Sequence, residues 1–171
     1  MRDSVNLKPH DIAVAIKILL IKERNWRQVD ISNELGISQS EIAKSIKRLK
    51  FAGIELEKKI NKAALLEIIL HGVKYFYPTK PGVLGFGIPT AISAPTHKSS
   101  VVNESEVFVW PFSKGELRGQ IVEPFYKNIA EASLKDRDFY DIMSAIDILR
   151  IGKARERNYA QQFIKKKVDL L

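Results

Sequence analysis

Two short helices joined at a single glycine form the pattern that most constrains the fold of this chain. The first helix is predicted over Gln28–Leu35 and ends at Gly36, because the turn in such a pair favours a positive φ angle. The second begins after Ser38, a typical N-cap residue, with Glu41 three positions later. The residues expected to pack the two helices together are Ile31, Leu35, Ile37, Ile42 and Ile46, with Ser32 as the small residue where the helices touch. Leu49 and Phe51 continue the apolar spacing of the second helix. This spacing predicts a helix-turn-helix.

Basic residues gather in the same part of the chain. The 171 residues include 28 Lys and Arg against 20 Asp and Glu, which gives a formal net charge of +8. Residues 1–100 hold 16 of the basic residues and nine of the acids, and Gln39 to Lys62 alone holds seven basic residues and three acids. A basic surface of this kind attracts polyanions such as nucleic acid, and it is also typical of a solvated helix face. Charge alone leaves both interpretations open.

The segments Leu35–Ile42 and Ile46–Gly53 resemble the winged helix-turn-helix transcriptional regulators of bacteria, broadly the MarR-like group. The resemblance covers about residues 9–92 if the wing is included. It implies that the second helix, about Ser38 to Lys50, enters the major groove of double-stranded DNA and that other helices form a homodimer. By position, the DNA-binding residues would be Ser38, Gln39, Ser40, Lys44, Lys47 and Arg48 on the helix, with Lys74 or Lys80 on the wing.

The residue types on the second helix suit contact with DNA. Gln39 can form two hydrogen bonds with the edge of adenine and Arg48 with the edge of guanine, whereas Lys44 and Lys47 suit phosphates. The sequence therefore favours a sequence-specific transcriptional regulator that binds double-stranded DNA. The alternative is a winged-helix module that binds a partner protein, as an antitoxin does, with its basic face merely solvated.

The rest of the N-terminal half is predicted to be helical up to the wing. A buried helix runs from Pro9 to Ile21, and a further helix runs from about Asn61 to His71, where Gly72 ends it. Strands at Val73–Tyr77 and Ile88–Ile92 would form the wing. The helix between the helix-turn-helix and the wing departs from the usual pattern of these regulators.

The fold class expected from these elements is α+β, an N-terminal winged helix-turn-helix with a C-terminal, mainly helical extension. The DNA-binding domain would span residues 1–95 and the extension residues 96–171. In the extension, Val107–Phe112 and Leu117–Val122 are predicted to form a hairpin, and apolar residues recur at helical spacing over Phe139–Leu149. We expect this extension to support dimerisation or the binding of a partner.

No catalytic residue, cofactor site or metal site is predicted, so the chain is not expected to be an enzyme. It has no Cys, which excludes disulfides, thiolate metal sites and cysteine nucleophiles. The run Gly82–Gly87 lacks the Lys-Ser or Lys-Thr of a phosphate-binding loop and is typical of a hairpin tip or a bend. The three histidines lie far apart in the sequence. The acids expected on exposed helix faces, with Arg137 and Arg150 as partners, are Asp136, Asp138, Asp141 and Asp147.

The sequence also predicts a protein without membrane contact. Its longest apolar run, Ile12 to Ile21, is broken by Lys17 and spans ten residues, about half of what a bilayer crossing requires. Residues 1–7 lack the features of a secretory signal. We therefore expect a cytoplasmic location.

Overall fold

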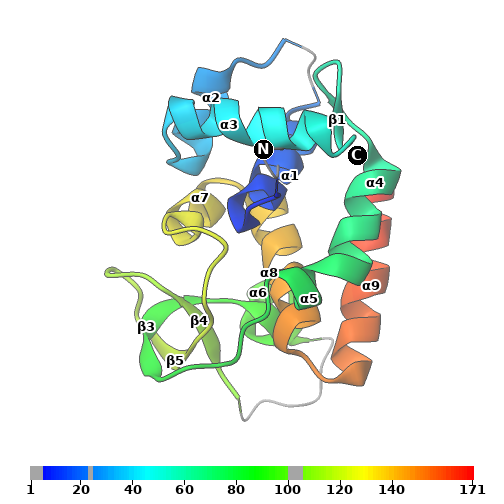
Figure 1. Ribbon diagram of the computed structural model, residues 1–171. Coiled ribbons are helices and arrows are strands. Elements are labelled where there is room, and N and C mark those ends of the chain that lie inside the picture. The colour runs from blue at the N-terminus through cyan, green and yellow to red at the C-terminus, as the bar shows by residue number, and fades with distance from the viewer. Residues whose placement is uncertain (1–5, 23–24, 100–105) are drawn as a thin grey trace.

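A computed structural model describes residues 6–22, 25–99 and 106–171 of the protein. Helices dominate, and two small sheets complete an α+β fold, as the sequence predicts. The N-terminal helices lie at one end of the molecule and a three-stranded sheet lies at the other, with a long C-terminal helix along one side (Figure 1). Within the described ranges, no helix is both long enough and apolar enough to cross a bilayer.

Three helices form the N-terminal end: α1 (Pro9–Ile21), α2 (Gln28–Leu35) and α3 (Gln39–Phe51). The core between them contains the predicted apolar residues Ile31, Leu35, Ile42, Ile46 and Leu49, all buried. The prediction for Phe51 is wrong, because its side chain is 74% exposed. Phe51 lies one turn beyond Lys47, on the outer side of α3.

A tight hairpin follows α3 directly. β1 (Glu55–Leu56) pairs antiparallel with β2 (Lys59–Ile60). The two residues of the turn, Glu57 and Lys58, have positive φ angles of 49° and 65°, as the tight turns that join antiparallel strands require. β1 packs against α3 and β2 against α1, so the hairpin is held beside the N-terminal helices.

The next helix continues past Gly72. α4 (Lys62–Glu67) runs through a π-helical turn, η1 (Ile68–Gly72), into α5 (Val73–Phe76). The strand predicted at Val73–Tyr77 is therefore wrong. Its aromatic and β-branched composition is outweighed by tertiary packing, because Val73 is buried and α5 packs against α8 (Arg137–Ile151).

Three strands pair with one another at the opposite end of the molecule. β3 (Leu84–Pro89) pairs antiparallel with both β4 (Phe108–Pro111) and β5 (Leu117–Ile121), and β4 pairs in parallel with β5. The predicted positions of the last two strands are confirmed. Their predicted pairing as a hairpin is wrong, because both lie antiparallel to β3 and are therefore parallel to each other.

The glycine-rich run Gly82–Gly87 lies mostly within β3 rather than at a hairpin tip. A Cβ atom on Gly87 would lie 1.8 Å from the carbonyl oxygen of Trp110, so only glycine permits this close approach of β3 to β4. The strand predicted at Ile88–Ile92 overlaps only the end of β3, since the chain then turns into the short helix η2 (Ala91–Ser93).

The predicted division at residue 95 cuts through this sheet, because β3 precedes that residue and β4 and β5 follow it. The boundary also falls at the start of α6 (Pro95–Lys98). The two halves make further contacts, since α1 packs against α8 and α2 against α7 (Ile129–Lys135). Lys17 forms an ion pair with Asp136 at 2.6 Å, and Asn128 donates a hydrogen bond to the carbonyl oxygen of Gly36 at 2.7 Å. Residues 1–95 and 96–171 are therefore not separate structural units.

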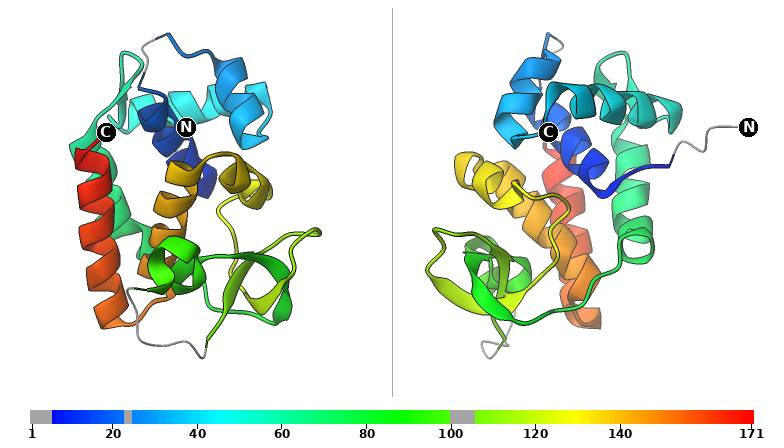
Figure 2. Two further views of the ribbon diagram at one scale, coloured as in Figure 1. Left: turned by 180° about the vertical axis from the view of Figure 1, so that it is seen from behind. Right: turned by 60° about the vertical axis from the view of Figure 1, so that its left-hand side comes forward.

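Helix α8 lies in the middle of the molecule and α9 (Ala154–Asp169) runs along its side (Figure 2). The apolar residues of Phe139–Leu149 are buried within the chain and leave no surface there for a two-fold contact. Asp147 was expected on an exposed face, and that prediction is wrong, because the side chain is fully buried. Its carboxylate pairs with Arg150 at 2.8 Å and accepts hydrogen bonds from Trp110 at 2.6 Å and Thr90 at 2.7 Å.

Asp141 is also buried, contrary to prediction, whereas Asp138 is exposed. Lys167 on α9 pairs with Asp138 at 2.7 Å and with Asp141 at 3.6 Å. Arg137 pairs with Asp141 at 3.0 Å along α8. The expected role of these acids as partners of nearby cations is therefore confirmed, although the surface position is right for only some of them.

Candidate nucleic-acid interface

The turn between α2 and α3 is fixed by backbone and side-chain hydrogen bonds. Gly36 ends α2 with a φ angle of 65°, and its N–H donates to the carbonyl oxygen of Ser32 at 2.8 Å. The Ser32 hydroxyl donates to the carbonyl oxygen of Ile37. Ser38 caps α3 by accepting a hydrogen bond from the N–H of Glu41 at 3.4 Å. The predicted glycine turn and the Ser38–Glu41 cap are both confirmed.

One side of α3 is open to solvent (Figure 1). The predicted site residues Ser38, Gln39, Ser40, Lys44 and Lys47 are all exposed there. Ser40, Lys44 and Lys47 stand at i, i+4 and i+7, so their side chains emerge as one stripe along the helix. We call the surface formed by Gln39, Ser40, Lys44, Lys47 and Lys50 the α3 face.

Lys50 extends the α3 face by one turn and was not among the predicted site residues. It stands three positions after Lys47 and its side chain is 59% exposed. The helical period of the stripe is the signal that identifies it.

The lysines of the α3 face are only weakly neutralised. Lys44 pairs with Glu41 at 3.9 Å and Lys50 with Glu55 at 3.7 Å, while Lys47 forms no ion pair with a described residue. Both pairs are long, but their acids are less exposed than the lysines, since the side chain of Glu41 is 25% exposed and that of Glu55 is fully buried. Lys47 is therefore the lysine of the α3 face that is most available to another anion, while Lys44 and Lys50 also balance an acid of the protein.

Arg48 points into the protein instead of onto the α3 face. Its side chain is 12% exposed, its Nε donates to the carboxylate of Asp11 at 2.7 Å, and a terminal nitrogen donates to Asp11 and to Glu41, each at 2.8 Å. The fully buried Asp11 also accepts a hydrogen bond from Ser45. The prediction that Arg48 lies on the groove-facing side of the helix is wrong, because carboxylates on α1 and α3 hold its guanidinium inward.

This network has a measurable electrostatic signature. The hydrogen bond from Arg48 outweighs the effect of burial and, helped by a second one from His10, lowers the pKa of Glu41 to about 2. In return, the hydrogen bonds to Asp11 and Glu41 raise the pKa of Arg48 above its ordinary value. The network joins the first turn of α1 to α3, and it fixes the orientation of α3 relative to α1.

The predicted wing residues lie elsewhere. Lys74 belongs to α5, where its Nζ lies 4.6 Å from the ring centroid of Tyr75, and Lys80 is exposed in the segment between α5 and β3. Their assignment to a wing is wrong because residues 73–76 are helical. The hairpin beside α3 is instead β1–β2, which carries Lys58 and Lys59, both exposed.

The β1–β2 hairpin is anchored on the α1–α2 connection. The indole nitrogen of Trp26, itself buried, donates to the carbonyl oxygen of Lys58 at 2.9 Å. Within the hairpin, the carboxylate of Glu55 accepts a hydrogen bond from the N–H of Lys58. Both contacts fix the backbone of the hairpin, so the side chains of Lys58 and Lys59 extend from a defined position beside α3.

The buried histidine of the C-terminal half, His97, has structural partners. His97 lies 3.0 Å from the hydroxyl of Tyr159 and 3.1 Å from that of Ser144, and burial lowers its pKa. Across the described ranges, no cluster of three or more His and acidic side chains could hold a metal ion. The α3 face and the β1–β2 hairpin are basic and face outward, and their ammonium groups and hydrogen-bond donors suit a polyanion.

No family model, no curated protein and no solved structure matches this chain.

Proposed function

We propose that the protein is a sequence-specific regulator of transcription that binds double-stranded DNA through a winged helix-turn-helix, with α3 as the recognition helix. The observation that carries the proposal is the α3 face, which is open to solvent while the inner side of α3 packs on α1 and α2. The 13 residues of α3 correspond to a length of about 20 Å at ~1.5 Å per residue. A major groove about 12 Å wide admits a helix of this kind.

The residues of the α3 face divide into two roles. Gln39, in the first turn, can form two hydrogen bonds with the edge of adenine. Its amide NH2 donates to N7, and its amide oxygen accepts from the N6 amino group. Lys44, Lys47 and Lys50 lie further along the helix and supply charge to phosphates or guanine edges. The β1–β2 hairpin takes the place of the wing, with Lys58 beside the duplex.

Selection from a pool of random duplexes tests this function directly. The full chain is expected to enrich one sequence motif, and to bind it at least about 1,000-fold more tightly than a scrambled duplex of the same composition. Fluorescence anisotropy at two salt concentrations measures both affinities. Binding without any enriched motif, or no binding at all, would contradict the proposal and favour a module that binds a partner protein.

We also propose that the regulator acts as a homodimer that presents two recognition helices. An exposed apolar patch beside the end of α3 is the surface that suits a second copy. It contains Phe51, Tyr75 and Phe76, which are 74%, 69% and 75% exposed. These residues adjoin a groove of about 550 Å³ lined by Asn6, Leu7, Phe51, Ala52, Ile68, Val73, Phe76 and Tyr77. Apolar surface of this kind is typical of contacts between subunits.

Light scattering at micromolar concentration tests the dimer. The wild-type chain is expected to have twice the mass of one chain, and Phe76→Glu is expected to have the mass of a single chain, because a carboxylate would be buried in the contact. Leu134→Glu, at a residue on α7 that is 59% exposed, is the matched control and should remain dimeric. A monomeric wild-type chain would contradict the proposal, and a dimeric Phe76→Glu variant would exclude this patch as the contact.

A further inference from the structure

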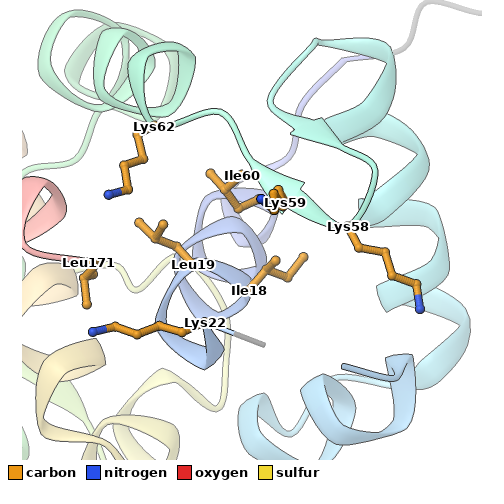
Figure 3. A pocket seen from close by; sticks show the side chains of 8 residues that line it. All are labelled: Ile18, Leu19, Lys22, Lys58, Lys59, Ile60, Lys62 and Leu171. Atoms are coloured by element: carbon orange, nitrogen blue, oxygen red, sulfur yellow. The ribbon is translucent and has the colours of Figure 1, made fainter. Parts of the chain in front are cut away.

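A second basic surface lies on the other side of the β1–β2 hairpin from α3 (Figure 3). The end of α1, the hairpin, the start of α4 and the last residue enclose a cavity of about 230 Å³. Its lining residues are Ile18, Leu19, Lys22, Lys58, Lys59, Ile60, Lys62 and Leu171. We call this cavity the lysine pocket, because half of its lining residues are lysines and none has an acidic side chain.

The lysines of the pocket come from three different elements. Figure 3 shows Lys22, at the end of α1, and Lys62, at the start of α4, reaching into the space on either side of Leu171. Lys59 lies on β2 beside Ile60, whereas Lys58 points away from the pocket, with its Nζ 5.7 Å from the ring centroid of Trp26. Lys22, Lys59 and Lys62 therefore line the pocket, and the ammonium groups of Lys22 and Lys62 are directed into it.

No acidic side chain is paired with these lysines in the part of the chain that the structure describes. No described carboxylate forms an ion pair with Lys22, Lys59 or Lys62, although the adjacent Lys50 is paired with Glu55. The ammonium groups repel one another, so their shared position favours an anion between them. The apolar side chains of Ile18, Leu19 and Ile60 lower the local dielectric constant and strengthen that attraction.

We propose that the lysine pocket binds a phosphate group. Phosphate carries up to two negative charges and several acceptor oxygens, so a single group can engage three ammonium groups at once. Lysine binds phosphate as a point charge and requires no fixed hydrogen-bond geometry. The cavity is smaller than the roughly 300–1,000 Å³ of sites that enclose drug-sized ligands, and this size favours one small group over a large molecule.

Two sources could supply this phosphate. One is the backbone of a duplex that lies on the α3 face and continues past the hairpin, and this source rests on the proposed DNA binding. The other is a free phosphate compound, which requires no DNA. The chemistry of the pocket is the same for both, and two separate measurements distinguish them.

The first measurement uses inorganic phosphate and the full chain. Phosphate is titrated at constant ionic strength, with chloride as the balancing salt, while the backbone amides are followed by NMR. Saturable shifts are expected at residues 18–22 and 58–62 in the wild-type chain, and their loss is expected in Lys59→Gln/Lys62→Gln. The control Lys98→Gln/Lys114→Gln removes the same charge from exposed lysines near the three-stranded sheet and should leave the shifts unchanged.

The second measurement uses the DNA motif recovered by selection and the same variants. If a backbone phosphate occupies the pocket, the slope of log affinity against log salt becomes shallower by about 0.9 in Lys59→Gln/Lys62→Gln, since the pocket holds one phosphate and each lost phosphate contact contributes about 0.9. The control variant keeps the wild-type slope. Phosphate-specific shifts together with an unchanged slope identify a free phosphate compound as the source.

The proposal is overturned if phosphate produces no saturable shifts beyond those of chloride and the pocket variant keeps the slope of the control. If no variant and no wild-type chain binds DNA, the proposed function fails, and the phosphate titration alone then decides whether the pocket is an anion site. The two proposals can therefore fail independently.

Discussion

Replacement of Arg48 by alanine is expected to lower the free energy of unfolding by about 3–5 kcal/mol, because it breaks a buried ion pair from one side only. Arg48 is 12% exposed and donates to Asp11, which is fully buried, and to Glu41. Without the guanidinium, the Asp11 carboxylate keeps its hydrogen bonds from the hydroxyl of Ser45 and the N–H of Lys8, and the ring nitrogen of His10 lies 3.6 Å away. An uncompensated buried charge accounts for most of the expected loss.

Urea unfolding followed by circular dichroism measures this loss, provided that the slope of free energy against denaturant stays the same. Lys47→Ala is the matched control, because it removes one cation from the next position of the same helix but from its exposed side. Its effect is expected to stay within about 0.5 kcal/mol. A loss below about 1 kcal/mol in Arg48→Ala would contradict the inward position of the guanidinium.

The same network determines how stability depends on pH. The pKa of Glu41 is lowered from 4.5 to about 2 in the folded protein, mainly by the hydrogen bond from Arg48. The stabilisation from this carboxylate is fully present above the unfolded pKa and is lost as the pH falls from about 4.5 to about 2. Part of the acid sensitivity of the wild-type chain thus comes from Glu41, and Arg48→Ala removes that part.

The α2–turn–α3 unit could be predicted from the sequence because its determinants are local. A glycine with a positive φ angle, a serine cap and apolar residues at helical spacing act over a few positions, and all three are found where the pattern places them, except that Phe51 is exposed. The exposed stripe of Ser40, Lys44 and Lys47 follows from the same periodicity. Most of the α3 face was therefore accessible from sequence alone.

The inward position of Arg48 depends on a partner that is distant in the sequence. Asp11 lies 37 residues earlier, and no local pattern connects the two residues. Helical spacing gives a partial signal, since Arg48 stands three positions after the buried Ser45 and seven after Glu41. That spacing places Arg48 at the border of the buried side of α3. At this position, the contact with Asp11 determines whether the side chain points inward or outward.

The predicted wing failed for a related reason. Val73–Tyr77 has the composition of a strand, but α5 is helical because it packs against α8, and the hydroxyl of Tyr77 donates to the carbonyl oxygen of Leu7 at 2.9 Å. The hairpin that lies beside α3 has strands of only two residues each, too short to produce an alternating pattern. Contacts between distant segments decided both elements.

Replacement of both Lys44 and Lys47 by alanine is expected to weaken DNA binding roughly tenfold or more and to make its salt dependence shallower. If both lysines contact phosphates, the slope of log affinity against log salt falls by about 1.8. When the salt concentration rises from about 50 mM to about 200 mM, the affinity of the wild-type chain would then fall by a factor about ten times larger than that of the variant. Fluorescence anisotropy with the selected duplex measures both slopes.

The matched control is Lys98→Ala/Lys114→Ala, which removes the same net charge from exposed lysines near the three-stranded sheet, at the opposite end of the molecule from α3 (Figure 1). If attraction of the duplex depended only on the net charge of the protein, both double variants would flatten the salt dependence equally, and α3 would not be the interface. If α3 lies in the groove, only the α3 variant changes the slope.

Stability separates this result from a loss of fold. Lys44 and Lys47 are exposed, so their removal should change the free energy of unfolding by less than about 1 kcal/mol in total. Arg48→Ala is expected to act in the opposite way, since it removes a cation that points into the protein and weakens the contact that orients α3. If the Lys44→Ala/Lys47→Ala variant loses DNA binding while it keeps its stability, the interface lies on the α3 face. Binding measurements would then assign Lys44 and Lys47 to DNA contact, and unfolding measurements would assign the neighbouring Arg48 to the stability of the fold.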